Sequence, residues 1–147
     1  MDDGKMGHAP MIKILIMGLP GSGKTTLASN LSTLLSPNCL WLNADTIREQ
    51  YNDWDFSYEG RLRQSKRMHD LAAESDTQYV VCDFVAPIKE MRDIFNPDIT
   101  IWMDTIAEGR FADTNKLFED PTGDLLRITT MDSEYWSKYI VKNLLAK

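Results

Sequence analysis

The sequence is poor in cysteine and has no long hydrophobic run, and these two absences exclude several classes of protein. Two cysteines in 147 residues are too few for a disulfide scaffold. A membrane-spanning helix needs roughly 18 apolar residues in a row, whereas the longest apolar run, 14–17, has the length of a strand. The first residues, MDDGKMGHAP, lack the apolar centre of a secretory signal. We expect residues 1–10 to be a tag remnant or a disordered arm, and the chain to act in the cytoplasm, away from membranes, with Cys39 and Cys82 buried and reduced.

An excess of positive charge is also absent. The chain has 16 Lys and Arg against 22 Asp and Glu, a net charge of −6. Nucleic-acid-binding proteins usually carry a basic surface, so we do not expect a nucleic acid partner. The length is that of one globular domain, which we expect over residues 11–147. Any anionic ligand must be held by a local positive site.

Apolar stretches alternate with helical patterns along the chain. We expect strands at 12–17, 39–43, 78–85 and 98–103 and a short fifth strand at 125–130. We expect helices at 27–35, 59–74, 87–95 and 134–145. Alternation of this kind, with continuously apolar strands, predicts a three-layer α/β fold with helices on both faces of a parallel sheet. Ligands bind beyond the carboxyl ends of such strands, so the side chains there are the candidates for function.

The strongest motif follows the first expected strand. Residues 18–26, GLPGSGKTT, fit G-x-x-x-x-G-K-[ST] with a strand before and a helix after. The glycines allow consecutive amides to face one anion, and the start of the helix adds its positive end. The motif predicts a P-loop NTPase fold that binds a nucleoside triphosphate with Mg²⁺. Lys24 would contact the outer phosphates and the Thr25 hydroxyl the metal. The predicted nucleotide-binding residues are Gly18, Leu19, Pro20, Gly21, Ser22, Gly23, Lys24, Thr25 and Thr26.

A guanine-reading N-K-x-D motif is missing, because the nearest segment, NKLF at 115–118, has no aspartate in the fourth position. The chain is also short for a motor ATPase. A small kinase is the class that fits both the loop and the length.

Charged side chains follow the second and third strands. Asp45 precedes Arg48 by three residues, which places both on one side of a starting helix. Asp45 suits proton abstraction or magnesium binding, and Arg48 suits a fork on an anionic acceptor. Asp83 lies within the apolar run YVVCDFV, where a lone charge is costly unless paired, and it is a candidate magnesium ligand. Simpler roles stay open, as a helix N-cap for Asp45 and a cap of the helix at 87–95 for Asp83.

Residues 53–67, DWDFSYEGRLRQSKR, gather positive charge in an acidic chain. Arg61 and Gln64 lie one helical turn apart, and Phe56 precedes them with a ring that could stack on a planar base. A second basic strip consists of Arg63, Lys66 and Arg67. A solvated helix with one packing aromatic stays open as the simpler interpretation, above all for Lys66.

Residues 12–105 resemble, in order, the motifs of the adenylylsulfate kinase family. The loop GLPGSGKTT is similar to the family's G-L-S-G-[AS]-G-K-[ST]-T, NADTIR at 43–48 to D-G-D-N-V-R, and WDFS at 54–57 to L-G-F-S. VCDFVAP at 81–87 is similar to V-x-x-F-I-S-P, and NPDITIWMDT at 96–105 to H-P-x-x-x-x-V-[FY]-V-D-T. The resemblance implies transfer of the γ-phosphate of ATP to the 3′-hydroxyl of adenylyl sulfate, in sulfate assimilation, by a homodimeric enzyme.

The resemblance also implies roles for individual residues. Lys24 and Asp45 would be catalytic, with Asp45 orienting or deprotonating the acceptor hydroxyl. Magnesium would be held by Thr25, Asp45 and Asp83, and Arg110 would clamp the nucleotide. The acceptor would be bound by Asp45, Arg48, Phe56, Arg61, Gln64, Phe84, Val85 and Lys116. A lid at 110–120 would close over the site.

Several positions depart from the family pattern. Ala86 replaces a serine, Gly60 an aspartate and Gln64 an asparagine, and the lid motif D-P-K-G-L-Y-K-K-A has only a loose counterpart in ADTNKLF at 112–118. Two other functions stay open. One is a nucleotide or polynucleotide 5′-end kinase, whose second basic strip follows a phosphate backbone with salt-dependent binding. The other is a nucleotide-binding module with little transfer activity.

Overall fold

The structure, a computed structural model, describes residues 10–146, so nearly all of the predicted N-terminal arm lies outside the described residues. Its strands are β1 (Ile12–Met17), β2 (Cys39–Asn43), β3 (Tyr79–Asp83), β4 (Ile99–Met103) and β5 (Leu126–Ile128). They form one five-stranded sheet in the order β2-β3-β1-β4-β5, and every neighbouring pair is parallel. The predicted parallel sheet is confirmed.

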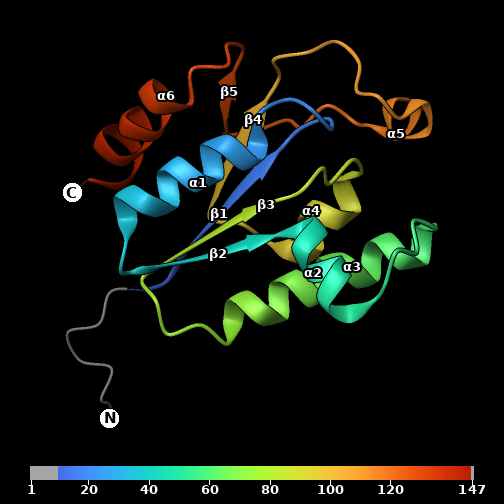
Figure 1. Cartoon of the computed structure of the whole chain (residues 1–147), viewed down its shortest axis with the longest axis horizontal. Coiled ribbons are helices and arrows are strands. Elements are labelled where there is room, and N and C mark those ends of the chain that lie inside the picture. The colour runs from blue at the N-terminus through green and yellow to red at the C-terminus, as the bar shows by residue number, and fades with distance from the viewer. Residues whose placement is uncertain (1–9, 147) are drawn as a thin grey trace.

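Helices cover both faces of this sheet (Figure 1). One face carries α1 (Lys24–Leu35) and α6 (Ser133–Ile140), which continues into a π-helical turn, η1 (Val141–Leu145). The other carries α2 (Ala44–Tyr51), α3 (Tyr58–Ala73) and α4 (Lys89–Phe95). The short helix α5 (Ala112–Leu117) lies beyond the carboxyl ends of the strands (Figure 1).

The central strand β1 supplies both halves of the core. Ile14 and Ile16 pack toward Leu27 of α1, and Leu15 and Met17 pack toward α3 and α4. All of these side chains are fully buried, and burial of each contributes about 1.5–3 kcal/mol. A strand buried on both faces is therefore continuously apolar, which is why its sequence gave a clear signal.

Several observed bounds differ from the predicted ones; β3 ends at Asp83 rather than residue 85, and α4 begins at Lys89 rather than residue 87. Helix α1 begins at Lys24 rather than residue 27, and the terminal helix changes to a π-helical turn at Val141. Helices α2 and α5 were not predicted as separate elements, although a helix start was expected near Asp45. The prediction that both cysteines are buried is wrong for Cys39, which is half-buried because β2 is an edge strand, whereas Cys82 is buried; neither forms a disulfide.

The order of the sheet positions a binding crevice. Strands β3 and β2 lie on one side of β1, and β4 and β5 lie on the other. The loops that leave the neighbouring strands β1 and β3 separate at their carboxyl ends, because they lead to α1 and α4 on opposite faces of the sheet. Ligands of such sheets bind at this place. Within residues 10–146, none of the helices has the length and apolar character needed to cross a membrane.

Candidate active site

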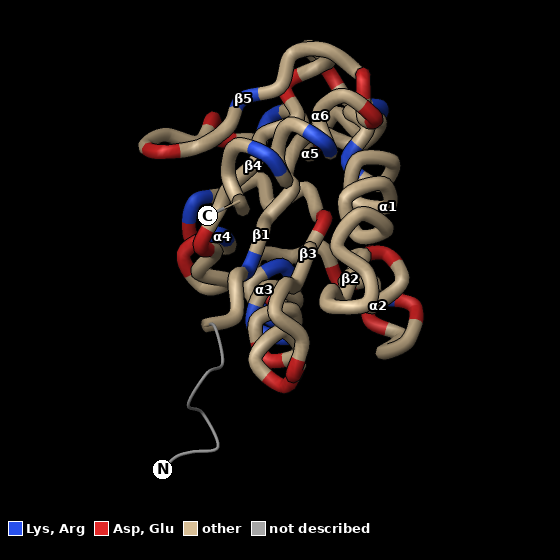
Figure 2. Tube along the Cα trace, turned by 90° about the vertical axis from the view of Figure 1, so that its left-hand side faces the viewer, with Lys and Arg blue, Asp and Glu red and all other residues tan. Residues whose placement is uncertain are grey.

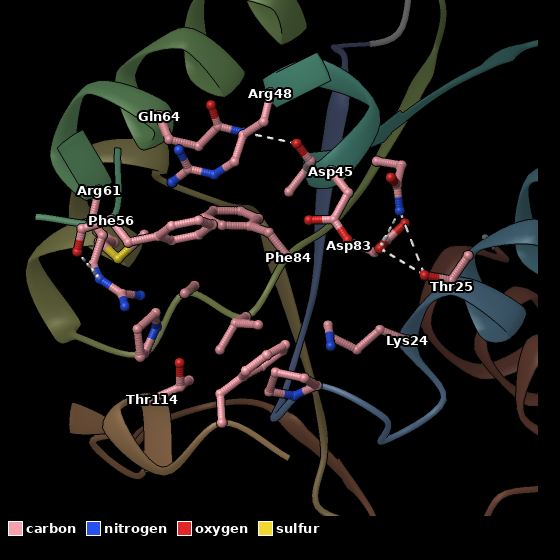
Figure 3. A pocket seen from close by; sticks show the side chains of 18 of the residues that line it. Lys24, Thr25, Asp45, Arg48, Phe56, Arg61, Gln64, Asp83, Phe84 and Thr114 are labelled. Carbon is pink, nitrogen blue, oxygen red and sulfur yellow. Dashed lines mark hydrogen bonds between the residues drawn. The ribbon is translucent and has the colours of Figure 1, made fainter. Parts of the chain in front are cut away.

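A cavity of about 440 Å³ opens at this crevice. Its walls come from the β1–α1 loop, the end of β2 with α2, the start of α3, the segment 84–87 after β3 and the residues 110–114 around α5. Figure 3 shows Lys24 and Thr25 at one end of the cavity and Phe56 and Arg61 at the other. Asp45 lies between the two ends (Figure 3).

The β1–α1 loop forms the first end of the cavity. Gly23 adopts φ 99°, a left-handed conformation that glycine accepts without strain, and it precedes α1 with no side-chain cap. The first amides of α1 are therefore left for an anionic ligand. Among the nine predicted nucleotide-binding residues of the loop, those that line the cavity are Pro20, Gly21, Lys24 and Thr25. The others, Gly18, Leu19, Ser22, Gly23 and Thr26, belong to the same turn or helix start without lining the cavity.

Lys24 is a buried cation, 9% exposed, whose Nζ donates to the Leu19 carbonyl at 3.1 Å. Loss of water on burial lowers the pKa of Lys24 to about 8. The carboxylates of Asp83 and Asp45 oppose this shift, and the positive charge of Arg110 adds to it. The ammonium group is thus short of negative partners, which favours a polyphosphate in the cavity.

Asp83, the last residue of β3, connects β3 to β2 and to the first turn of α1 through hydrogen bonds. Trp41 Nε1 donates to its Oδ2 at 2.6 Å, and Asn43 Nδ2 and Thr25 Oγ1 donate to its Oδ1 at 2.9 and 3.3 Å. Burial raises the pKa of Asp83, while the indole hydrogen bond and the charge of Lys24 act in the opposite direction. Asp83 therefore bonds to the phosphate loop rather than capping α4.

The oxygen atoms of Thr25, Asp83 and Asp45 suit a hard cation. No group of three or more His, Cys, Asp and Glu side chains that could enclose a metal occurs among residues 10–146. Magnesium rarely needs such an enclosure, because it is bound by one or two protein oxygens together with water and ligand phosphates. The residues at this end of the cavity therefore fit a magnesium ion that arrives with a polyphosphate.

Helix α2 presents Asp45 and Arg48 to the cavity. Its N-cap is Asn43, whose Oδ1 accepts from Thr46 N at 2.9 Å. The N-cap of α2 is thus Asn43, and the alternative interpretation of Asp45 as the N-cap is wrong. Arg48 is buried and donates through Nη1 to the carbonyls of Asp53 at 2.9 Å and Asp55 at 3.3 Å. Burial lowers the pKa of Arg48, and the negative charge of Asp53 opposes this shift.

Phe56 and two arginines form the second end of the cavity. The Cζ atoms of Arg48 and Arg61 lie 4.2 and 5.4 Å from the centroid of the Phe56 ring, and Arg61 Nε donates to the Phe56 carbonyl at 2.9 Å. The ring itself is 52% exposed. Burial lowers the pKa of Arg61, and Asp113 of α5 opposes the shift. An exposed aromatic face beside two guanidinium groups suits a planar base attached to an anion.

Gln64 lines the cavity, but both of its polar atoms have protein partners. Its Nε2 donates to the Ala44 carbonyl at 3.0 Å, and its Oε1 accepts from Arg67 Nη1 at 3.1 Å. In this arrangement Gln64 holds α3 against the start of α2. Acceptor binding by Gln64 stays a prediction.

The position that departs from the family aspartate has a steric explanation. A Cβ atom on Gly60 would lie 2.8 Å from the carbonyl carbon of Asp55, a distance at which the backbone must move. Glycine therefore lets the 53–57 segment, which carries Phe56, pack against the start of α3. The Ser57 side chain completes the turn by accepting from Gly60 N.

The remaining walls come from the segment after β3 and from α5. Phe84 and Val85, which the family resemblance implies as acceptor-binding residues, line the cavity, and Ala86 follows with φ 46°; their contact with an acceptor stays a prediction. Arg110 and residues of α5 line the opposite wall, with Asn115 fastening α5 to Gly109 through hydrogen bonds of 2.8 and 2.9 Å. Lys116 does not line the cavity, and its role in acceptor binding stays a prediction.

Sequence reasoning missed three residues of this site: Trp41, Asn43 and Asp113. An asparagine between a strand and a helix is a typical N-cap, so Asn43 had a usable signal. Trp41 reaches Asp83 across neighbouring strands, and Asp113 faces the cavity from a helix that had no clear sequence pattern. Neither could be found from local spacing.

The comparison with protein families gives a match over most of the chain. The family model described as adenylylsulphate kinase matches residues 11–137. A curated relative, the probable adenylyl-sulfate kinase of Aeropyrum pernix, is 36% identical over 89 residues, which are 56% of this chain and 49% of the relative. The matched part thus spans about half the length of that relative.

Solved structures share the fold over nearly the whole chain. The Mycobacterium tuberculosis APS kinase in complex with AMPPNP and APS aligns with a TM-score of 0.74 at 19% identity, covering 94% of this chain and 100% of that chain. Shikimate kinase from Acinetobacter baumannii in complex with shikimate aligns with a TM-score of 0.62 at 17% identity, covering 92% and 93%. These likenesses confirm the predicted three-layer P-loop fold.

Proposed function

The chain belongs to the adenylylsulfate kinase family, and from this premise we propose that it transfers the γ-phosphate of ATP to the 3′-hydroxyl of adenylyl sulfate, giving 3′-phosphoadenylyl sulfate and ADP. One observation carries the proposal: a single cavity has a phosphate loop at one end and Phe56 between two arginines at the other. Asp45 lies between these ends (Figure 3). A phosphate donor and an anionic nucleotide acceptor would therefore meet beside one carboxylate.

The donor end would hold ATP·Mg²⁺. The free amides of the loop and the Lys24 ammonium bind the outer phosphates, and Arg110 approaches them from the α5 side. Thr25 and Asp83 supply oxygens for magnesium, with Asp45 near the transferred group. When bound, magnesium neutralises negative charge on the phosphates. Residues around α5 exclude water from the cavity.

The acceptor end would hold adenylyl sulfate by its base and its anionic group. Phe56 stacks on the adenine, Arg48 and Arg61 bind the phosphosulfate, and the segment with Phe84 and Val85 forms the wall. Asp45 orients the 3′-hydroxyl and accepts its proton as the new O–P bond forms. Catalysis is then mostly positioning and charge neutralisation, as is usual for phosphoryl transfer.

The ion pairs made by the second basic strip, Arg63, Lys66 and Arg67, make a polynucleotide acceptor less well supported. Arg63 Nε and Arg67 Nη2 donate to Asp53 at 2.9 and 3.0 Å, and Lys66 donates to Asp70 at 2.8 Å. Figure 2 shows that basic positions on α3 are accompanied by acidic ones on α2 and α3. A strip already paired within the chain has little charge left to follow a phosphate backbone.

A pure nucleotide-binding module is also less well supported, because the cavity has a complete second end. Residues 110–114 line the cavity opposite Phe84 and Val85, so the short lid segment still covers the site. This favours transfer over binding alone.

The test is an assay of the purified chain with Mg²⁺·ATP and adenylyl sulfate, with separation of 3′-phosphoadenylyl sulfate and ADP. We expect product from the wild type and from Lys66→Ala, whose exposed side chain lies on α3 outside the cavity. Arg61→Ala, on the same helix, should lose about tenfold or more in kcat/KM for the acceptor while binding ATP within about twofold. Nucleotide binding without phosphorylation of adenylyl sulfate would contradict the proposal.

Two further parts of the proposal concern the setting of the enzyme. The two free thiols fit a reducing compartment such as the cytoplasm. The homodimer implied by the family resemblance is tested by sedimentation of the full chain, in which a monomer at micromolar concentration would contradict it.

A further inference from the structure

Arg92 of α4 is a buried cation, 8% exposed, that lies outside the lining of the cavity. Its Nε donates to the Ala86 carbonyl at 2.8 Å, and its Nη2 donates to the carbonyls of Pro87 at 3.2 Å and Glu119 at 2.5 Å. A buried guanidinium is costly unless its donors are satisfied. Here the donors go to backbone carbonyls of two separate segments, one directly before α4 and one that lies 27 residues after Arg92 in sequence.

Glu119 makes two further hydrogen bonds between its own segment and the start of α4. Its backbone N donates to the Pro87 carbonyl at 2.6 Å, and its Oε1 accepts from Lys89 N at 2.6 Å. The N-cap residue of α4, Ile88, offers no side-chain cap of its own. Glu119 therefore caps α4 from a segment that follows α5.

The end of this segment is also fixed to the sheet. Phe118 stacks on Trp102 of β4 with a centroid distance of 6.4 Å, and the Arg92 guanidinium lies 5.4 Å from the Phe118 ring. Before the lid begins, Thr105, which follows β4, donates to the Ser22 carbonyl at 2.7 Å. Between these two anchors, residues 107–113 are mostly exposed. The segment is therefore held at its ends while α5 covers the cavity.

The backbone conformation of Ala86 indicates what the hydrogen bonds of Arg92 do to the cavity wall. Ala86 has φ 46°, a left-handed conformation that costs a residue with a Cβ about 1–2 kcal/mol and persists only when its surroundings hold it. The hydrogen bond from Arg92 Nε to the Ala86 carbonyl is such a restraint. The neighbouring residues Phe84 and Val85 form the cavity wall, so the position of the wall depends on this restraint.

We propose that Arg92 is a positioning residue that joins the cavity wall at 84–87 to the end of the lid at 118–119, so that occupation of the acceptor end and closure of α5 are coupled. The identity of the acceptor rests on the proposed function; the connection between wall and lid does not. Arg92 acts through these two segments and touches neither ligand.

The first test measures hydrogen exchange of backbone amides in the absence of ligands. Arg92→Lys keeps the positive charge but loses the planar fork that reaches several carbonyls at once. We expect the amides of Lys89 and Glu119 to exchange about tenfold faster or more in Arg92→Lys. Asp93→Asn is the matched control, because Asp93 lies on the same helix and only forms an exposed ion pair with Lys89. Equal exchange in wild type and Arg92→Lys would overturn the proposal.

The second test separates positioning from simple loss of structure. Arg92→Lys should raise the KM of the acceptor about tenfold and lower kcat, while the KM of ATP stays within about twofold. Glu119→Ala, which removes the cap of α4 but leaves Arg92, should change the same two constants by a smaller factor. A fall in kcat with both KM values unchanged would mean only a smaller folded fraction and would contradict the coupling.

The two proposals fail in different ways. If the wild type does not phosphorylate adenylyl sulfate, the proposed function is wrong, and the exchange of Lys89 and Glu119 still decides whether Arg92 makes the connection. If the wild type is active but Arg92→Lys exchanges and reacts like it, the proposed function stands and the role of Arg92 is wrong.

Discussion

The two ends of the cavity are built in different ways. The phosphate-binding part of the donor end comes from one continuous segment, 18–26, which joins β1 to the first turn of α1, and its binding groups are backbone amides and one buried lysine. The acceptor end combines α2, the 53–57 segment, α3, the wall at 84–87 and α5. There Arg48 and Arg61 donate to backbone carbonyls of the 53–57 segment, and Gln64 donates to the Ala44 carbonyl of α2. A continuous site is fixed by its own turn, whereas an assembled site depends on contacts between distant segments.

Lys24→Met should give the largest effect, because it removes the single cation of the donor loop. Loss of one electrostatic contact to the transferred phosphoryl group lowers turnover by about 10²–10³-fold. Without nucleotide, the variant should melt no lower than the wild type, since a desolvated ammonium is replaced by an apolar chain. Turnover measurements and thermal melting check both expectations. A large loss of stability would show that Lys24 supports the fold rather than the ligand.

Arg48→Ala should break the acceptor end and weaken the fold at the same time. It leaves the carbonyls of Asp53 and Asp55 without their buried donor, at a cost of about 1.5–3 kcal/mol in the free energy of unfolding. Acceptor binding should be lost while nucleotide affinity is kept. Denaturant unfolding and nucleotide titration measure the two effects, with Lys138→Ala, an exposed i,i+4 pair partner on α6, as the control. Equal loss of nucleotide binding would contradict the separation of the ends.

Gly60→Ala tests whether the 53–57 segment sets acceptor affinity. The added methyl group would meet the Asp55 backbone and displace the segment that carries Phe56, at a cost of about 1–3 kcal/mol. We expect the KM of the acceptor to rise about tenfold with the KM of ATP unchanged. Lys66→Ala is the control, because Lys66 lies on the same helix with an exposed side chain outside the cavity. Similar kinetics for both variants would remove the 53–57 segment from the account.

The pH dependence gives the smallest and most selective effect. The pKa of Lys24 is about 8 in the folded chain and 10.5 without burial. Between these values the unfolded state binds more protons, so the contribution of Lys24 to stability improves as pH rises. Nucleotide binding needs the ammonium form, so ATP should bind about fourfold more weakly at pH 8.5 than at neutral pH. Titration of ATP from pH 7 to 9 measures this, and Lys24→Met should show no such trend.

The same contrast explains what could be predicted from the sequence. The P-loop and the buried strands have local patterns, since Gly23, Lys24 and Thr25 are adjacent and β1 is continuously apolar. Asp45 and Arg48 were found because they follow a strand directly. The partners of these residues were not, because the carbonyls that hold Arg48 lie in a loop without a periodic pattern.

Contacts between distant segments had no local signal at all. Trp41 of β2 donates to Asp83 on the neighbouring strand β3, and Arg92 of α4 donates to the carbonyl of Glu119 at the end of the lid. The family motif predicts that Gln64 binds the acceptor; Gln64 lines the cavity, and its amide also bonds to Ala44 and Arg67. A motif predicts which residues face a cavity more reliably than it predicts whether their polar atoms are free.

The most direct test of two separable ends is calorimetric titration of the full chain with each ligand alone. A non-hydrolysable ATP analogue with Mg²⁺ and, separately, adenylyl sulfate would be titrated into the wild type, Lys24→Met and Arg61→Ala. We expect a crossed result, in which Lys24→Met loses only the nucleotide and Arg61→Ala loses only adenylyl sulfate. If each variant weakened both ligands equally, or if the wild type did not bind adenylyl sulfate, the cavity would not be the two-ended site described here.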